Sequence, residues 1–76
     1  MNSNRIDPKE AAKLDVITAE MKDMMLVMEE ENTLFTSRSN QQASKRARVA
    51  SIHLSTLAKK YRKESMKIAS KLPIKA

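Results

Sequence analysis

The stretch SKRARVASIHLSTLAKKYRKESMKIASK, residues 44–71, decides the fold, because it has the pattern of one long basic helix. Its apolar residues follow one another in steps of three and four, which places them on one side of an α-helix. The rest of this helix is dense in Lys and Arg and carries a single acid, Glu64. Such a helix needs a partner for its apolar stripe, while its cations face either water or an anionic surface. The stripe consists of Ala47, Ala50, Leu54, Leu57, Tyr61 and Ile68.

The length and composition of the chain limit how it can be stabilised. Its 76 residues make one small helical domain, residues 1–76, and a chain this short buries only about 60% of its unfolded surface. There is no Cys, so disulfide bonds and thiolate metal sites are excluded, and the one His with scattered acids makes no metal cluster. We therefore expect no metal and no cofactor, and we expect self-association to supply further stability.

A first helix is predicted over residues 8–35. Asp7 is placed to cap its first free N–H groups, Pro8 suits the first helical position, and Glu10 is expected to reach back to the cap. Apolar side chains, ending in Phe35, then recur at heptad spacing, with Glu31 interrupting the last inner position.

A short polar turn is predicted over residues 36–40, followed by a second helix over 41–72. Ser39 with Gln42 is a possible capping box for this helix, and Pro73 is expected to end it. Gly is absent from the chain, which favours long helices over a sheet with tight turns. The fold class is therefore all-α, with two helices of matching length in an antiparallel hairpin.

Self-association is expected because residues 24–28 make the first helix apolar nearly all round. One neighbouring helix cannot cover such a segment, whereas two hairpins paired into a four-helix bundle can. Val49, Ile52 and Met66 lie off the main stripe of the second helix and favour the same second packing surface. The residues assigned to the core or to the dimer interface are Leu14, Ile17, Met21, Met24, Met25, Met28, Leu54, Leu57, Tyr61 and Ile68.

The net charge of +6 is divided unevenly along the chain. Residues 1–38 hold five basic and eight acidic side chains, whereas residues 39–76 hold ten basic and one acidic side chain. This division predicts that the second helix meets an external polyanion; double-stranded DNA is the expected partner, and the charge alone does not distinguish it from RNA. The alternative is that the basic side is simply solvated, or that the oppositely charged halves attract each other within the hairpin.

The candidate DNA contacts are cations spaced by one helical turn, about 5–6 Å, which is close to the spacing of phosphates along a strand. The one aromatic residue among them, Tyr61, belongs to the apolar stripe, so the sequence favours contact with the DNA backbone over base stacking. The predicted contacts are Arg46, Arg48, Lys59, Lys60, Arg62, Lys63, Lys67 and Lys71.

Other classes of function are disfavoured. There is no Cys nucleophile or Gly-rich phosphate loop, and His53 has no evident catalytic partner, so we do not expect an enzyme. The polar start and the short apolar run at residues 24–28 predict neither a secretory signal nor a membrane span. The hypothesis that the second helix lies on an anionic membrane has less support, because that helix lacks Trp and Phe. A helical scaffold protein that does not bind nucleic acid remains the alternative.

The pattern RxRxxSIxLxxxAKxYRKESxK over residues 46–67 resembles the N-terminal domain of the chlamydial histone H1-like proteins, and residues 61–65 are its most specific part. The resemblance implies a cytoplasmic, nucleoid-associated protein whose helical part self-associates and which condenses DNA by binding it nonspecifically. That family also carries a Lys-, Ala- and Pro-rich tail, which these 76 residues do not contain. Either the tail lies outside them, or the helical body binds DNA by itself.

Overall fold

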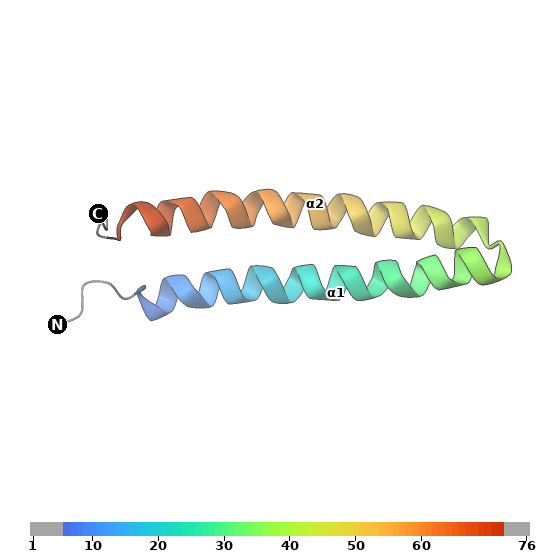
Figure 1. Ribbon diagram of the computed structural model, residues 1–76, viewed down its shortest axis with the longest axis horizontal. Coiled ribbons are helices and arrows are strands. Elements are labelled where there is room, and N and C mark those ends of the chain that lie inside the picture. Colours follow the sequence, from blue (N-terminus) through green and yellow to red (C-terminus); the bar gives the residue numbers. More distant parts are fainter. Residues whose placement is uncertain (1–5, 73–76) are drawn as a thin grey trace.

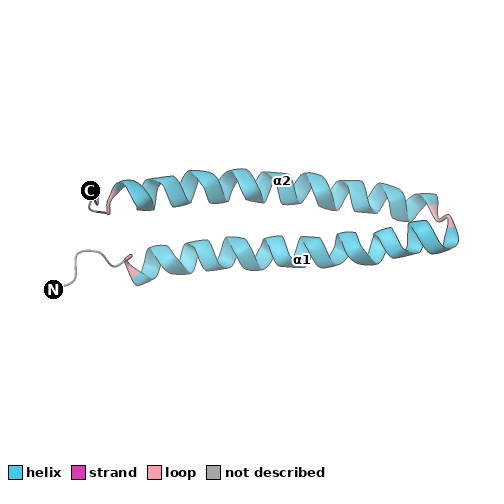
Figure 2. Cartoon of the chain, viewed as in Figure 1, coloured by secondary structure: helices cyan, strands magenta, loops and turns pink. Residues whose placement is uncertain are grey.

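The computed structural model describes residues 6–72 and folds them into two helices, α1 (Pro8–Arg38) and α2 (Gln41–Ser70). The helices lie side by side and antiparallel, so that the start of α1 is next to the end of α2 (Figure 1). This part of the chain contains no strand (Figure 2). The molecule is a rod with principal extents of 57 × 20 × 16 Å. The predicted all-α antiparallel hairpin is confirmed, and its pairing into a four-helix bundle remains a prediction.

The first turn of α1 has the predicted cap but not the predicted capping box. Asp7 Oδ1 accepts a hydrogen bond from the backbone N–H of Lys9 at 2.8 Å, and Pro8 occupies the first turn. Glu10 was expected to reach back to the cap, and this expectation is corrected. Its carboxylate instead accepts from Lys71 Nζ at 2.6 Å, because a charged ammonium is a stronger donor than a backbone amide.

The end of α1 lies three residues beyond its predicted end at residue 35. Thr36 and Ser37, predicted to lie in the turn, continue the helix, and their hydroxyls donate to backbone carbonyls one turn earlier. Ser39 then adopts a left-handed conformation with φ 52°, which ends α1. Only Ser39 and Asn40 therefore connect the two helices, in place of the longer turn predicted over residues 36–40.

The start of α2 is capped by Asn40. Its side chain accepts from the backbone N–H of Ala43 at 3.1 Å, so the suggested capping box of Ser39 with Gln42 does not form. Asn is among the best N-cap residues, and Ser39 is already committed to ending α1. Two adjacent residues thus end α1 and cap α2, and this short connection holds the helices close together at this end.

The end of α2 lies at Ser70, two residues before its predicted end at residue 72. The backbone N–H groups of Lys71 and Leu72 bond to carbonyls three residues earlier, at 3.1 Å each. Bonds of this spacing form a tighter turn than the α-helix, and they finish the helix here. Pro73, predicted to stop the helix, lies outside the described residues.

The inner faces of the two helices form a narrow apolar seam. Within residues 6–72 no polar side chain is buried, and the fully buried residues are Ile17, Ala43, Ala50, Leu57 and Ile68. Most of the other residues predicted for the core are half-buried: Leu14, Met21, Met24, Met28, Leu54 and Tyr61. Met25, by contrast, is 46% exposed on this single hairpin. Two helices thus cover one another along a single line and leave much of their apolar surface open.

Phe35 departs from the predicted apolar stripe. Its side chain is 41% exposed, and Leu34 is the half-buried residue at this level of α1. The fully buried Ala43 and the two-residue connection bring the helices close together near the turn. A phenyl ring does not fit between helices at such close approach, so the Phe35 ring lies at the flank of α2.

Candidate nucleic-acid interface

The outward side of α2 carries most of the predicted DNA contacts. All eight predicted cations are exposed, and six of them have no carboxylate oxygen within ion-pair distance in the described part of the chain. These six are Arg48, Lys59, Lys60, Arg62, Lys63 and Lys67. All but Arg48 fall within nine consecutive residues, a rise of about 12 Å along the helix. We call these five the basic segment: Lys59, Lys60, Arg62, Lys63 and Lys67.

The remaining two predicted contacts are engaged by acids of α1. Arg46 donates to the Glu31 carboxylate near the turn, and Lys71 Nζ donates to Glu10 at the open end of the hairpin. The hydrogen bond to Glu31 raises the pKa of Arg46. The hydrogen bond to Glu10, followed by the charge of Glu10, raises the pKa of Lys71. Both cations therefore already have an anionic partner.

The two acids in these pairs sit on the inner side of α1. The side chains of Glu10 and Glu31 are 24% and 12% exposed, less than those of their cationic partners. The sequence shows Glu31 as an interruption of the apolar stripe, and the structure explains it as an anchor for Arg46. The two pairs close the apolar seam at its two ends and fix how the helices are aligned.

Glu64, the one acid of α2, does not neutralise the basic segment. It is half-buried at an inner position and forms no ion pair with a described residue. Its charge contributes to raising the pKa of Lys71, which lies at the open end of the hairpin. The cations around it consequently face outward without a compensating charge.

Exposed apolar residues of both helices lie on the turn side of the basic segment. Met25, Leu26 and Val27 are 46%, 49% and 37% exposed on α1, and Val49 and Ile52 are each 67% exposed on α2. The end-to-end alignment set by the two ion pairs brings residues 25–27 level with residues 49–52 of α2. We call these five residues the apolar belt. It shares no residue with the basic segment, and Ile52 and Lys59, seven residues apart, lie on the same side of α2.

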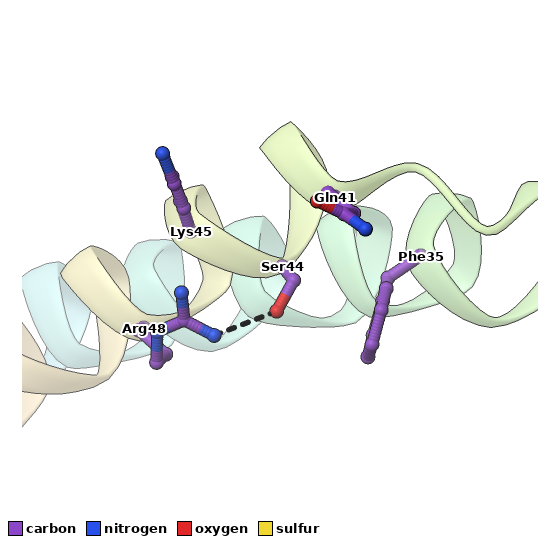
Figure 3. A pocket seen from close by; sticks show the side chains of 5 residues that line it. All are labelled: Phe35, Gln41, Ser44, Lys45 and Arg48. Carbon is purple, nitrogen blue, oxygen red and sulfur yellow. Dashed lines mark hydrogen bonds between the residues drawn. The ribbon is translucent and has the colours of Figure 1, made fainter.

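Two shallow pockets lie along the flanks of the hairpin. The larger, about 300 Å³, is near the turn and is lined by Phe35, Gln41, Ser44, Lys45 and Arg48 (Figure 3). Sequence reasoning missed this group, because it assigned Phe35 to the seam. Glu31, which replaces an apolar residue one turn earlier, was the available signal that the stripe ends there.

The second pocket, about 190 Å³, is lined by Glu20, Asp23, Met24, His53 and Leu57. His53 is exposed at its edge, on the flank of α2 as the heptad position predicts. No hydrogen bond joins His53 to either acid among the described side chains. Across residues 6–72 no three His, Asp or Glu side chains gather as a metal site would require. Neither helix, as far as it is described, includes an apolar segment long enough to cross a bilayer.

A sequence model of the family "Histone H1-like protein Hc1" matches residues 18–71, which span most of α1, the connection and α2. The chain belongs to this family. The resemblance predicted from residues 46–67 is thereby confirmed. The Hc1 family is a family of histone-like nucleoid proteins. The matched part contains the basic segment, the apolar belt and the Phe35 pocket. No curated protein and no solved structure matches the chain.

Proposed function

We propose that this Hc1-family protein binds the backbone of double-stranded DNA nonspecifically through the basic segment and Arg48. The observation that supports this proposal is the basic segment itself, five outward cations within nine residues and with no carboxylate partner. Like charges this close destabilise a helix, and phosphates along a strand offset that cost. The side chains are long and point outward from a helix, which suits contact with phosphates more than reading of base edges.

Arg46 and Lys71 take a lesser part in this proposal. Each already donates to a carboxylate of α1, so contact with a phosphate would first require that ion pair to break. The DNA-facing surface is therefore the basic segment in the second half of α2, together with Arg48 near the start of that helix. At 57 Å the rod is as long as roughly 17 base pairs, and the basic segment covers only a small part of that length.

The proposal includes a homodimer formed through the apolar belt. The single hairpin exposes 6241 Å², whereas a compact monomer of its mass exposes roughly 4,700 Å². The difference, roughly 1,500 Å² for one chain, exceeds the roughly 800 Å² that each partner buries in a standard protein interface. In this proposal the second copy covers Leu26 and Ile52 and crosses the rod at an angle, because Lys59 and Lys63 lie on the Ile52 side of α2 and a copy lying along the rod would cover them. This arrangement gives the four-helix bundle that the sequence predicts.

A dimer of this kind carries two basic segments, one on each copy. Two separate cationic surfaces on one particle can hold two duplexes, or two parts of one duplex. We propose that compaction of DNA follows from this bridging, without any sequence preference.

The test compares matched lysine triples on the two helices. In K59A/K63A/K67A, three cations of the basic segment are removed, and in K9A/K13A/K22A, three exposed lysines of α1 are removed for the same change in net charge. Binding to a 24-base-pair duplex is measured between 50 and 250 mM salt by fluorescence anisotropy. If six cations of a hairpin meet phosphates, log K falls against log salt with a slope of about −5, and the α2 triple lowers this to about −3.

The expected loss of affinity for the α2 triple is about 100-fold at 0.15 M salt, and the α1 triple is expected to stay within about threefold of the unchanged protein. Circular dichroism of both variants checks that the helices are retained. Equal losses of duplex affinity in the two triple variants would contradict the assignment of the DNA contacts to α2. Absence of duplex binding by the unchanged protein at micromolar concentration would instead favour a scaffold protein that does not bind nucleic acid.

A further inference from the structure

The pocket near the turn combines an aromatic ring with cationic and amide side chains. Phe35 comes from α1, whereas Gln41, Ser44, Lys45 and Arg48 come from the first two turns of α2. In Figure 3 Ser44 lies between Phe35 and Arg48, and the Arg48 guanidinium reaches toward the Ser44 hydroxyl. The pocket volume of about 300 Å³ lies at the small end of ligand sites, so it suits one planar ring and not a large molecule.

The aromatic ring in this pocket is available for stacking. Phe35 is the only Phe of the chain, and its side chain is 41% exposed although the seam lies beside it. Bases that are not stacked in a duplex bind to aromatic side chains regardless of sequence, because every base presents a flat face. Tyr61, the other aromatic residue, lies half-buried in the seam and does not offer this.

The polar groups around Phe35 match the rest of a nucleotide. Arg48 Nη1 donates to Ser44 Oγ at 2.7 Å, which orients the guanidinium beside the pocket. Neither Arg48 nor Lys45 forms an ion pair with a described carboxylate, so both charges are available for phosphates. In Figure 3 the Lys45 side chain extends in the opposite direction to the Phe35 ring. Gln41 supplies an amide, which is both donor and acceptor, at the pocket wall.

We propose that the Phe35 pocket holds one unstacked nucleobase of a nucleic-acid strand, with Arg48 and Lys45 on the adjacent phosphates. The proposal rests on the proposed function, since it assumes that the chain binds nucleic acid. It adds a second mode of binding at the turn: the basic segment meets duplex backbone, and the pocket takes a base from a single-stranded or frayed stretch. Arg48 takes part in both modes, and it lies about 16 Å along α2 from Lys59, the nearest cation of the basic segment.

The first experiment uses a 12-nucleotide single strand and an abasic strand of the same length and phosphate count. The unchanged protein is expected to bind the strand with bases about tenfold more tightly than the abasic strand. F35L retains an apolar side chain without a ring, and it is expected to bring this ratio close to one while duplex affinity is unchanged. A ratio that F35L leaves unaltered overturns the proposal. So does a loss in F35L that is equal for duplex and single strand, which would instead indicate a wedge between duplex base pairs.

The second experiment keeps the stacking surface and reports on it directly. The chain has no Trp, so F35W introduces a single fluorophore at the pocket. Its fluorescence is expected to be quenched by the strand with bases and not by the abasic strand. Quenching by AMP alone would show that a free nucleotide suffices, whereas quenching by the strand alone would show that the flanking phosphates are needed. If neither AMP nor the strand with bases quenches the fluorescence of F35W, the proposal that the pocket binds a nucleobase is overturned.

Failure of the pocket and failure of the proposed function give different results. If F35L and F35W show no base-dependent binding but the α2 lysine triple still weakens duplex binding, the nucleobase proposal is wrong and the proposed function stands. If neither duplex nor single strand binds, the proposed function is lost together with it. Circular dichroism of F35L and F35W serves as the folding control, and both should retain their helices because Phe35 lies outside the seam.

Discussion

α1 and α2 have similar inner faces and different outer faces. Inside, both place apolar side chains at heptad positions, and Ile17 of α1 is buried much as Leu57 of α2 is. Outside, α1 carries apolar residues and acids, whereas α2 carries the basic segment and fewer apolar residues. The comparison teaches that the inner faces determine the hairpin, while the outer faces determine what each helix can bind. An outer face can therefore be changed without loss of the fold, and the predictions below use this separation.

The largest effect is expected from L57A, which removes a buried side chain from the seam. Leu57 is 5% exposed, so the substitution should lower the free energy of unfolding by about 2–4 kcal/mol, measured by urea denaturation. The control is Val16→Ala on the outer face of α1, where 58% of the residue is exposed and the change should stay within about 0.5 kcal/mol. Similar losses in the two variants would show that the inner and outer faces are not separate.

The next effect concerns the outer face of α1. L26K places a charge in the apolar belt and should weaken the dimer about 100-fold, because an unpaired charge is costly to bury in an interface. V16K introduces the same charge on the same helix outside the belt and should leave the dimer nearly intact. Sedimentation velocity over a range of concentrations measures both. A dimer of unchanged strength in L26K would place the self-association elsewhere.

A smaller effect separates free cations from paired ones on α2. K63Q should lower duplex affinity about fivefold at 0.15 M salt and reduce the salt slope by about one. K71Q should lower it less, because Lys71 is already held by Glu10 in the free protein. The comparison is made by fluorescence anisotropy on the same duplex. If K71Q lowers duplex affinity as much as K63Q does, the ion pair at the open end does not restrain Lys71.

The smallest effect is expected at the connection, which belongs to neither outer face. Ser39 has a left-handed backbone with φ 52°, so S39G should raise the free energy of unfolding by about 0.5–1 kcal/mol. S37G makes the same kind of change inside the last turn of α1 and should lower it by about 1 kcal/mol. Thermal unfolding followed by circular dichroism distinguishes the two signs. DNA affinity should be unchanged in both variants.

Much of the hairpin was predictable from the sequence, because its determinants are local. Steps of three and four mark the seam, Asp7 and Pro8 mark the start of α1, and the lack of Gly favours long helices. The predicted bounds differ from the structure near the ends, where side chains choose between several backbone partners. Thr36 illustrates this, since its hydroxyl bonds to a helical carbonyl although its residue type also suits a turn.

The surface was less predictable, because its properties depend on which residues meet across the hairpin. Composition places Arg46 and Lys71 among the free cations, but the antiparallel alignment brings each to an acid of α1. Periodicity places Phe35 in the seam, but the close approach of the helices near Ala43 leaves it outside. Both differences arise from pairing between residues far apart in the sequence, which spacing along one helix does not reveal.

The two ion pairs at opposite ends of the seam have a mechanical consequence. If one helix slid past the other by a single turn, both carboxylates would leave their cations together, and the two-residue connection offers no slack for such a movement. The alignment of the two helices therefore sets the spacing of the charges along the hairpin, including that of the cations in the proposed contact with DNA.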